Sequence, residues 1–497
     1  GLISVLSSAL SLYRQVLPAA AGSRNWPEAQ EGRAWRLTSL RDPTPWVRDR
    51  IDGPRRAGVL AVSRGASSSY VILEEAEVAA NSQSAGADAR AAYRGDLPLS
   101  EGLFVVEGED SGEIVVGLRN LMQAATDAAG PSGTDTHGSV TIHHIATNWW
   151  ESHPDLPDAP LAITLIARDA DELRSLAQSA AGQLERGHDP SDRSAGRVFF
   201  SSDPLGPTGE LAFVYPGSGS QYADMGRELC LQWPEILRAQ DRGNDRLKSQ
   251  LKAAEIWGDG PGIGDARTVI LSQVALGTIA TDLMAEFGVR PDAVVGYSLG
   301  ETAGLFSVGA WHERDEMLRR VTESELFKND LTGRCNAARQ AWGVAENAEV
   351  EWAVGVVETP AARAREVLEE FDRVYLLIVN TPDECVIGGD RSAVENAVER
   401  LGCPFHALEG VPTVHCEVAT QVSEPYRDLH VLDTRPPEGI RVYSGAWGEA
   451  YEVDQARAAD SLLAQAIQGV DFPKTVRQAH DDGVRIFLEM GPGESCV

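Results

Sequence analysis

A serine at position 298 stands in a pattern that is typical of a catalytic nucleophile. Residues 294–301 read Val-Val-Gly-Tyr-Ser-Leu-Gly-Glu. The two valines predict the end of a buried strand, and the apolar residues after Gly300 predict a helix. Gly296 and Gly300 permit a tight turn between them, and the N-terminus of the helix would face the Ser298 hydroxyl. The pattern predicts nucleophilic attack on a carbonyl carbon, although an ordinary turn could carry the same residues.

A serine nucleophile needs a neighbouring base that accepts its proton. The chain has ten histidines, and His415 is the best candidate because it follows a short apolar segment, 117 residues after the serine. On spacing alone, a histidine in a surface loop is the better interpretation. His137, His143 and His144 lie in a polar loop without carboxylate or cysteine partners in register, so we expect a surface role there and no metal site.

Charge and cysteine content exclude several classes of function. The formal net charge is -30, which argues against nucleic-acid binding because phosphate groups need clustered Lys and Arg. Six scattered cysteines without a Cys-x-x-Cys pair favour a reducing, cytoplasmic setting. No apolar run approaches the length of a membrane span, and Arg14 and Gln15 within the N-terminal apolar stretch indicate a helix rather than a signal peptide. Because the first residue is Gly1 and not Met, we expect a part of a longer protein.

The first two hundred residues read as an N-terminal segment, a linker and a small domain. Residues 1–75 contain one helical pattern and two short strands, which are too few to bury a core alone. Residues 76–100 have the composition of a linker. Residues 101–205 predict a small α/β domain with strands at 103–106 and 161–167, helices at 114–125 and 172–184, and a polar loop between the two pairs.

Residues 206–497 predict a larger α/β domain around Ser298. A buried strand at 211–215 runs into a glycine-rich turn, an apolar helix covers 269–285, and a strand at 293–295 leads to the serine. Residues 345–412 form an insert with the βαββαβ order of a ferredoxin-like unit. We expect its strands at 352–357, 374–379, 385–387 and 405–408, its helices at 361–371 and 393–401, and a closing strand of the domain at 485–488.

The N-terminal segment resembles the C-terminal end of a ketosynthase of polyketide or polyunsaturated fatty acid synthases. The resemblance rests on Trp46–Val59, which reads Trp-Val-Arg-Asp-Arg-Ile-Asp-Gly-Pro-Arg-Arg-Ala-Gly-Val, and on Val71–Glu75. It implies that residues 1–75 are a fragment of a thiolase-like domain without condensing activity, because the catalytic residues of that family lie upstream. The segment departs from the family at Ser68, Ser69 and Tyr70.

The larger domain resembles the acyl-CoA:acyl-carrier-protein acyltransferases of type I synthases, and the small domain resembles the linker that follows ketosynthases. Five motifs occur in the order and spacing of the acyltransferase family: 213–221, 296–301, 379–390, 414–415 and 489–493. The resemblance implies an α/β-hydrolase-like parallel sheet with an inserted ferredoxin-like subdomain. It looks closest to polyunsaturated fatty acid synthases or related lipid synthase subunits.

Carried over by position, the resemblance implies that Ser298 is the nucleophile and His415 the general base. It places the N–H groups of Leu299 and Ser218 in the oxyanion hole. The acyl group would move from coenzyme A to the serine, and then to the phosphopantetheine thiol of an acyl carrier protein among the other synthase domains. The family needs no metal and no covalently bound cofactor. A backbone carbonyl near Gly491–Gly493 orients its histidine.

The substrate-binding positions depart from the family. Gln221 and Asn380 lie within its motifs, but Ser218 replaces a glutamine. The arginine that clamps a malonyl carboxylate falls on Glu323, which would repel malonyl. Arg319 and Arg320 lie one helical turn earlier and are candidates to replace it, or they form a solvated helix face or a carrier-docking patch. An uncharged acyl group is therefore favoured over malonyl.

Two alternatives stay open at this point. The chain could be an acyl hydrolase that releases or edits acyl chains, using the same acyl-serine with water as the acceptor. It could also be a catalytically reduced docking module, as the departures at Ser218 and Glu323 and the truncated ketosynthase suggest. An intact pair of Ser298 and His415 would argue against the docking module.

Overall fold

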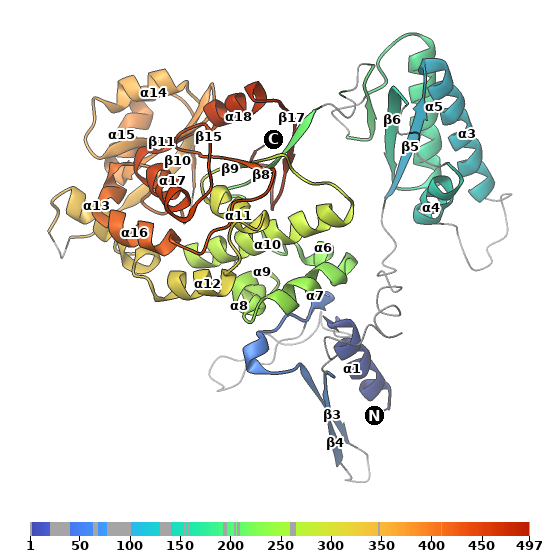
Figure 1. Ribbon diagram of the computed structural model, residues 1–497, viewed down its shortest axis with the longest axis horizontal. Helices are drawn as coiled ribbons and strands as arrows, with labels where there is room; N and C mark the ends of the chain where they lie inside the picture. The colour runs from blue at the N-terminus through green and yellow to red at the C-terminus, as the bar shows by residue number, and fades with distance from the viewer. Residues whose placement is uncertain are drawn as a thin grey trace. The chain divides into compact units, whose positions relative to one another are not determined.

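The computed structural model describes most of the chain, and it divides into two compact units. One unit contains Gly1–Gly95 and Glu210–Val497, and the other contains Asp96–Gly209. Figure 1 shows the secondary structure of both. The described residues are 2–19, 40–62, 68–76, 101–129, 141–153, 156, 159–191, 196–202, 205, 209–258, 265–345, 348–408 and 410–496.

The core of the larger unit is a parallel sheet of four strands with one antiparallel edge strand. The strand order is β15-β14-β9-β8-β17, in which β14, β9, β8 and β17 run parallel. Val294 and Phe213 in the central strands are fully buried, as expected for a sheet that is covered on both faces. The strands are β8 (Glu210–Tyr215), β9 (Ala293–Gly296), β14 (Arg441–Tyr443), β15 (Ala450–Tyr451) and β17 (Val484–Glu489).

Helices cover both sides of this sheet. In Figure 1, α10 (Ala266–Glu286) and α11 (Leu299–Ser307) are drawn below β8 and β9, and α18 (Phe472–Asp481) above them. The remaining helical segments are α6 (Arg227–Gln232), α7 (Pro234–Gly243), α8 (Leu247–Leu251), α9 (Ala253–Ile256), α12 (Arg314–Glu323), a π-helical turn (Leu326–Asp330), α13 (Asn336–Ala341), a 3-10 turn (Glu417–Val422), α16 (Ser423–His430) and α17 (Gln455–Gln468).

The segment between α13 and the 3-10 turn forms a second sheet with the expected βαββαβ order. Its strand order is β13-β10-β12-β11, and all neighbouring pairs are antiparallel. The elements are β10 (Trp352–Val357), α14 (Ala361–Leu368), β11 (Val374–Thr381), β12 (Glu384–Asp390), α15 (Arg391–Leu401) and β13 (Phe405–Ala407). A fifth strand, β16 (Val470–Asp471), pairs in parallel with β11 and links this sheet to the segment after α17.

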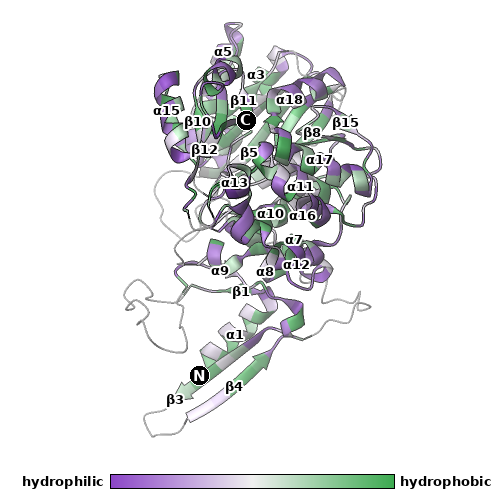
Figure 2. Cartoon of the chain, turned by 90° about the vertical axis from the view of Figure 1, so that its left-hand side faces the viewer, coloured by the Kyte–Doolittle hydropathy of each residue, from purple (hydrophilic) through white to green (hydrophobic). Residues whose placement is uncertain are grey.

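The N-terminal segment packs on helices of the larger unit. Its elements are α1 (Leu2–Arg14), β1 (Val16–Leu17), β2 (Thr44–Pro45), a 3-10 turn (Arg50–Asp52), β3 (Arg56–Val62) and β4 (Ser68–Glu74). Val47 shares an apolar cluster with Met225 and Trp257. Buried Arg55 forms ion pairs with Glu75 and Asp241. The segment is therefore joined to its neighbours through Val47 and Arg55. The apolar residues of β3 and β4, which Figure 2 shows, are mostly exposed, Leu60 and Ile72 among them.

The smaller unit has its own apolar core beneath a three-stranded antiparallel sheet, β5-β6-β7. Its elements are β5 (Gly102–Gly108), α3 (Ser111–Ala129), α4 (Ile142–Ser152), β6 (Leu161–Ala167), α5 (Ala170–Glu185) and β7 (Val198–Phe200). The prediction of a loop around His143 and His144 was wrong, because both lie on α4. Ile142, Ile145 and Trp149 form a buried helical stripe that the polar neighbours obscured. His137 lies outside the described residues.

Helix α10 differs from the expectation that no apolar run approaches the length of a membrane span. Among the described residues, α10 is long and apolar enough to cross a membrane by length and composition. Of its most apolar window, 78% is buried inside the protein. Its position beside α11 explains the composition, because a helix in the centre of a large core needs apolar residues on nearly every side.

Candidate active site

Ser298 occupies a strained turn between β9 and α11. Its φ is 53°, a left-handed value that is rare for residues other than glycine. A Cβ atom at Gly300 would overlap the carbonyl oxygen of Tyr215, and one at Gly296 would overlap the backbone N atom of Glu301. The two glycines are therefore required for the close approach of strand and helix. The turn presents the Ser298 hydroxyl at the N-terminus of α11.

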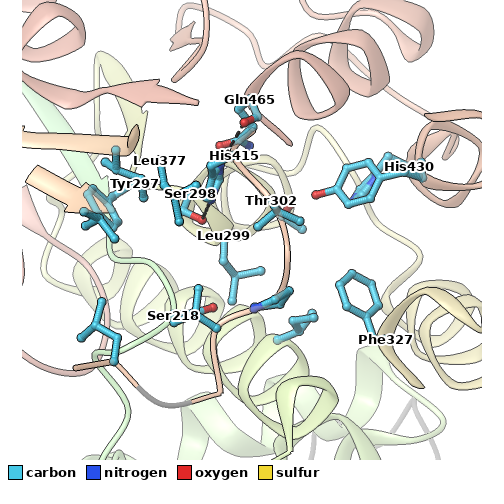
Figure 3. Close-up of a pocket in the computed structure, with 18 of the residues that line it drawn as sticks. Ser218, Tyr297, Ser298, Leu299, Thr302, Phe327, Leu377, His415, His430 and Gln465 are labelled. Carbon is cyan, nitrogen blue, oxygen red and sulfur yellow. Dashed lines mark hydrogen bonds between the residues drawn. The ribbon is translucent and has the colours of Figure 1, made fainter. Parts of the chain in front are cut away.

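His415 lies directly beside this hydroxyl. Its Nε2 atom is 2.7 Å from Oγ of Ser298 (Figure 3). On the other side of the ring, Nδ1 lies 2.9 Å from the carbonyl oxygen of Gln465. Because a carbonyl only accepts hydrogen bonds, Nδ1 carries the proton and Nε2 is free to accept one from the serine. This tautomer is the one that a general base requires.

The surroundings keep this imidazole uncharged. His415 is only 5% exposed, and burial lowers its pKa to about 4, although the hydrogen bond to the Gln465 carbonyl opposes the lowering. The His415 backbone N–H also donates to the carbonyl of Ala466 at 2.7 Å. Both carbonyls lie at the C-terminal end of α17, where the helix dipole would stabilise an imidazolium that forms during the reaction.

The carbonyl that orients the histidine was predicted in the wrong place. It belongs to Gln465 in α17, and not to the turn near Gly491–Gly493. A backbone carbonyl has no residue signature, so its identity depends on which helix the fold brings to His415. No feature of the sequence marks Gln465 for this role.

The two residues predicted to form the oxyanion hole both lie at this pocket. Leu299 and Ser218 both line the pocket that contains Ser298. Neither backbone N–H donates a hydrogen bond to another described residue. Donors that are fixed in position and free of protein partners can stabilise the oxyanion of a tetrahedral intermediate. Ser218 presents a backbone group, so the substitution of glutamine by serine at this position leaves the donor in place.

The pocket beside Ser298 is mostly apolar (Figure 3). No Lys or Arg is among the described residues that line it. Its polar members besides Ser298, His415 and Ser218 are Tyr297, Thr302, Tyr426, His430 and Gln465. The apolar members are Ile270, Leu299, Met317, Phe327, Leu377, Ile378, Val386, Leu408, Val411, Pro412 and Val414. An environment of this kind favours an uncharged acyl group.

The two candidate replacements for the malonyl clamp are engaged elsewhere. Arg319 is exposed and pairs with Glu316 and Glu323. Arg320 donates to the carbonyls of Asp428, Leu429 and Val431 beyond the C-terminal end of α16 and at its last turn. Neither arginine lines the pocket, and neither does Glu323. The structure therefore does not place these residues in the substrate pocket. Arg319 and Glu323 pair with each other on the exposed helix surface, and Arg320, one turn after Met317, is held by Glu316 and by α16.

Gln221 and Asn380 lie near the site without lining the pocket. Oε1 of Gln221 accepts from the N–H of Gly219 at 2.8 Å, which braces the loop that carries Ser218. Oδ1 of Asn380 accepts from the Tyr297 hydroxyl at 2.7 Å. The structure therefore gives both residues contacts that position the site, instead of the direct substrate contacts that the motifs predicted.

A serine on a strand–helix turn, a buried histidine of the right tautomer and two free N–H groups define a class of enzymes that act through an acyl-serine. Comparison with known proteins identifies the family. The profile described as "Acyl transferase domain" matches residues 212–492, which is more than half of the chain. The chain belongs to this family, and the predicted acyltransferase resemblance is confirmed.

Curated relatives of the chain include polyketide synthases. The chain is 25% identical to polyketide synthase GfsE of Streptomyces halstedii over 510 residues, covering 99% of this chain and 12% of the relative. It is 23% identical to 6-methylsalicylic acid synthase of Penicillium patulum, covering 99% of this chain and 25% of the relative. The chain thus spans a quarter or less of the length of these relatives. The closer resemblance to polyunsaturated fatty acid synthases stays a prediction.

Solved structures show the same fold. The acyltransferase domain of SpnD, in complex with 2-(pent-4-yn-1-yl)malonyl, aligns with a TM-score of 0.58 at 22% identity, over 80% of this chain and 86% of that chain. The acyltransferase domain of an iterative polyketide synthase in enediyne biosynthesis aligns with a TM-score of 0.53 at 21% identity, over 79% of this chain and 86% of that chain. The chain is an acyltransferase of the type found in polyketide and fatty acid synthesis.

Proposed function

We propose that this acyltransferase moves an acyl group from coenzyme A to the phosphopantetheine thiol of an acyl carrier protein, with Ser298 as nucleophile and His415 as general base. The single observation that carries the proposal is the 2.7 Å contact between Oγ of Ser298 and Nε2 of His415. The contact lies at an apolar pocket whose lining includes Leu377, Ile378 and Val386 of the second sheet.

In the first half-reaction, Oγ of Ser298 attacks the thioester carbonyl carbon while its proton passes to Nε2 of His415. The negative charge that forms on the carbonyl oxygen is stabilised by the N–H groups of Leu299 and Ser218. The C–S bond then breaks, and the proton moves from His415 to the sulfur of the departing coenzyme A. The product is an acyl ester of Ser298.

The second half-reaction repeats these steps with the carrier thiol as the attacking group. The thiol gives its proton to His415 as its sulfur bonds to the ester carbon. The C–O bond breaks, and the proton returns to Oγ of Ser298. The chemistry needs no metal and no covalently bound cofactor beyond the phosphopantetheine of the carrier.

The acyl group is uncharged in this proposal. A malonyl carboxylate would need a cation or several donors in the pocket. The described lining residues include no Lys or Arg, and burial lowers the pKa of His430 to about 4. The carboxylate would therefore lose its hydration without a compensating partner.

The proposed setting is a multidomain synthase in the cytoplasm. The partner is the carrier protein domain, and a ketosynthase lies upstream if residues 1–75 are its C-terminal fragment. All six cysteines are free thiols, which supports a reducing compartment. Acyl-CoA and holo-carrier protein are both available there.

The proposal is tested by incubating the chain with butyryl-CoA and a phosphopantetheinylated carrier protein, followed by intact-mass analysis of the carrier. We expect acyl-carrier to form with the unmodified chain and the rate to fall at least about a thousandfold in Ser298→Ala. Release of free coenzyme A and free acid without carrier acylation would instead indicate a hydrolase. No acyl transfer and no release with any acyl-CoA would indicate a docking module.

A further inference from the structure

Three side chains in the wall of the acyl pocket each have a polar atom without a hydrogen-bond partner among the described residues. Thr302 lies on α11, and Tyr426 and His430 lie on α16; all three line the pocket that contains Ser298. Thr302 is 3% exposed and His430 is 4% exposed. The hydroxyl groups of Thr302 and Tyr426 and the Nε2 atom of His430 make no hydrogen bond to another described residue. In Figure 3, Thr302 and His430 lie on the same side of Ser298.

Buried polar groups in folded proteins nearly always have partners, because an unpartnered one costs about 1–3 kcal/mol. Thr302 and His430 are buried, and Tyr426 is partly buried. Met317 and Phe327, which line the same pocket, are apolar and cannot supply a hydrogen bond. Polar groups in the wall of such a pocket are therefore best explained by a ligand group that satisfies them together.

The hydrogen-bonding character of His430 is fixed by its neighbour. Its Nδ1 atom lies 2.8 Å from the carbonyl oxygen of Tyr426, so Nδ1 donates and Nε2 presents a lone pair to the pocket. Burial lowers the pKa of this imidazole, and the positive charge of Arg320 adds to the lowering. The wall thus offers one fixed acceptor, Nε2, and two hydroxyl groups that can donate.

We propose that Thr302, Tyr426 and His430 bind a hydroxyl group of the acyl chain, so that the pocket selects hydroxyacyl groups over plain alkyl groups. This inference rests on the proposed function. A hydroxyl group donates a hydrogen bond to Nε2 of His430 and accepts one from Tyr426 or Thr302, so it supplies the partners that these pocket groups lack. A ketone or a carboxylate only accepts hydrogen bonds, so it would leave the His430 lone pair unpartnered or repel it.

The position of Thr302 indicates where the hydroxyl lies. Thr302 lies in the first turn of α11, about 5 Å along the helix axis from Leu299, the residue that follows the nucleophile. The thioester carbon must lie at bonding distance from Oγ of Ser298. A hydroxyl that contacts Thr302 is therefore only a few bonds from that carbon, and a 3-hydroxyacyl group fits this separation.

The test compares acylation of Ser298 by 3-hydroxybutyryl-CoA, butyryl-CoA and malonyl-CoA, measured as kcat/KM by rapid-quench intact-mass analysis. For the unmodified chain we expect a preference of at least about tenfold for 3-hydroxybutyryl-CoA over each of the others. Tyr426→Phe and Thr302→Val remove single hydroxyl groups with little change of shape. Each should lower the ratio of kcat/KM for 3-hydroxybutyryl-CoA to kcat/KM for butyryl-CoA by about tenfold.

Tyr222→Phe is the matched control, because Tyr222 is 52% exposed and does not line the pocket. It should leave the ratio unchanged. Equal rates for 3-hydroxybutyryl-CoA and butyryl-CoA in the unmodified chain would overturn the inference while leaving the proposed function intact. A preference for malonyl-CoA would overturn both the inference and the proposal that the acyl group is uncharged, while leaving acyl transfer through Ser298 intact. Failure of all three thioesters to acylate Ser298 would overturn both. The ratio of kcat/KM for 3-hydroxybutyryl-CoA and butyryl-CoA in the unmodified chain tests the inference even if a variant does not fold.

Discussion

Ser298 and His415 share a conformational feature that links their chemistry to their backbone. Both have positive φ values, 53° and 68°. Such values cost about 1–3 kcal/mol for residues with a Cβ atom and persist only where the surroundings enforce them. For Ser298 the enforcing contacts are the glycines on either side. For His415 they are the hydrogen bonds from its N–H and Nδ1 to α17.

The burial of His415 has a consequence for the pH dependence of acylation. The rate follows the fraction of neutral imidazole, and burial lowers the pKa to about 4. We expect kcat/KM for butyryl-CoA to be nearly constant from about pH 6 to 8 and to fall only as the pH approaches 4. The measurement is acyl-enzyme formation across pH 4 to 8, with circular dichroism at each pH to confirm folding. A midpoint near the ordinary histidine value of about 6.5 would contradict the account.

Gly300 gives a second prediction at this scale. A Cβ atom there would meet the Tyr215 carbonyl, so Gly300→Ala should displace the turn and lower acylation of Ser298 at least about a hundredfold. Gly243→Ala is the control, since nothing lies within 4 Å of the added atom. The control should acylate at the normal rate and be equally or slightly more stable. Normal acylation in Gly300→Ala would show that the close approach is not required.

The sequence identified some residues of the candidate site and missed others. Ser298 and His415 carry side-chain chemistry within recognisable motifs, so both were identified. The clamp candidates failed because motif spacing gives a position along α12 but not the direction of the side chain. The hydroxyl of Tyr426 and the ring of His430 were missed, because no pattern in the sequence shows that α16 lines the same pocket as α11.

At the scale of elements, the site depends on how α11 and α17 are held together. Glu301, fully buried in the first turn of α11, accepts hydrogen bonds from Ser461 in α17, from the N–H of Gly445 and from the hydroxyl of Tyr451. Ser461 lies one helical turn before Gln465, whose carbonyl contacts the ring of His415. One carboxyl group thus links the helix after the nucleophile to the helix that supports the base.

The burial of Glu301 predicts a pH effect on stability. Burial raises its pKa to about 7, although its three hydrogen-bond donors oppose the rise. The folded state therefore binds a proton that the unfolded state has lost between about pH 4.5 and 7, and stability falls as the pH rises through this interval. Glu301→Gln should remove this part of the pH dependence. The difference in the urea midpoint between the two proteins, measured from pH 5 to 8, tests it.

The comparison with Glu301→Gln is needed because His415 and His430 change the folding stability with pH in the direction opposite to Glu301. Burial lowers both of their pKa values to about 4, so their contribution to stability grows as the pH rises from about 4 to 6.5. Both histidines are present in the variant, so their effects cancel in the difference. A difference that does not change with pH would contradict the role given to Glu301.

The elements themselves were largely predictable. Strands such as β8 and β9 are continuous apolar runs, and the insert alternates strands and helices of ordinary length. The exception is α4, whose buried stripe is hidden among histidines, threonine and tryptophans. The pairing of β16 with β11 also could not be predicted from the sequence, because a strand of two residues has no hydrophobic periodicity.

At the scale of the whole molecule, the N-terminal segment and the larger domain form one unit across more than a hundred intervening residues. Arg55 is central to this joint. It is 5% exposed, donates to the Trp46 carbonyl at 2.5 Å, and pairs with Glu75 and Asp241. Asp49 adds a second connection by accepting from the hydroxyl and N–H of Ser249.

Removal of Arg55 should take one of two cationic partners from Glu75 and Asp241, since Arg48 also pairs with both carboxylates. We expect Arg55→Ala to lower the free energy of unfolding of this unit by about 1–3 kcal/mol, which urea denaturation followed by tryptophan fluorescence would measure. The adjacent Arg56 is the matched control, because its ion pair with Glu74 is more than half exposed on both sides. Arg56→Ala should cost less than about 1 kcal/mol. Equal effects of the two substitutions would contradict a structural joint at Arg55.

The central claim is that an acyl group passes through Ser298, and peptide mapping of the acylated chain tests it most directly. The chain is mixed briefly with butyryl-CoA or 3-hydroxybutyryl-CoA, quenched in acid, digested and analysed by tandem mass spectrometry. The account predicts one acyl adduct on Ser298, which is absent in Ser298→Ala and forms at least about a thousandfold more slowly in His415→Ala. An adduct on another residue, or acylation that survives Ser298→Ala, would contradict it.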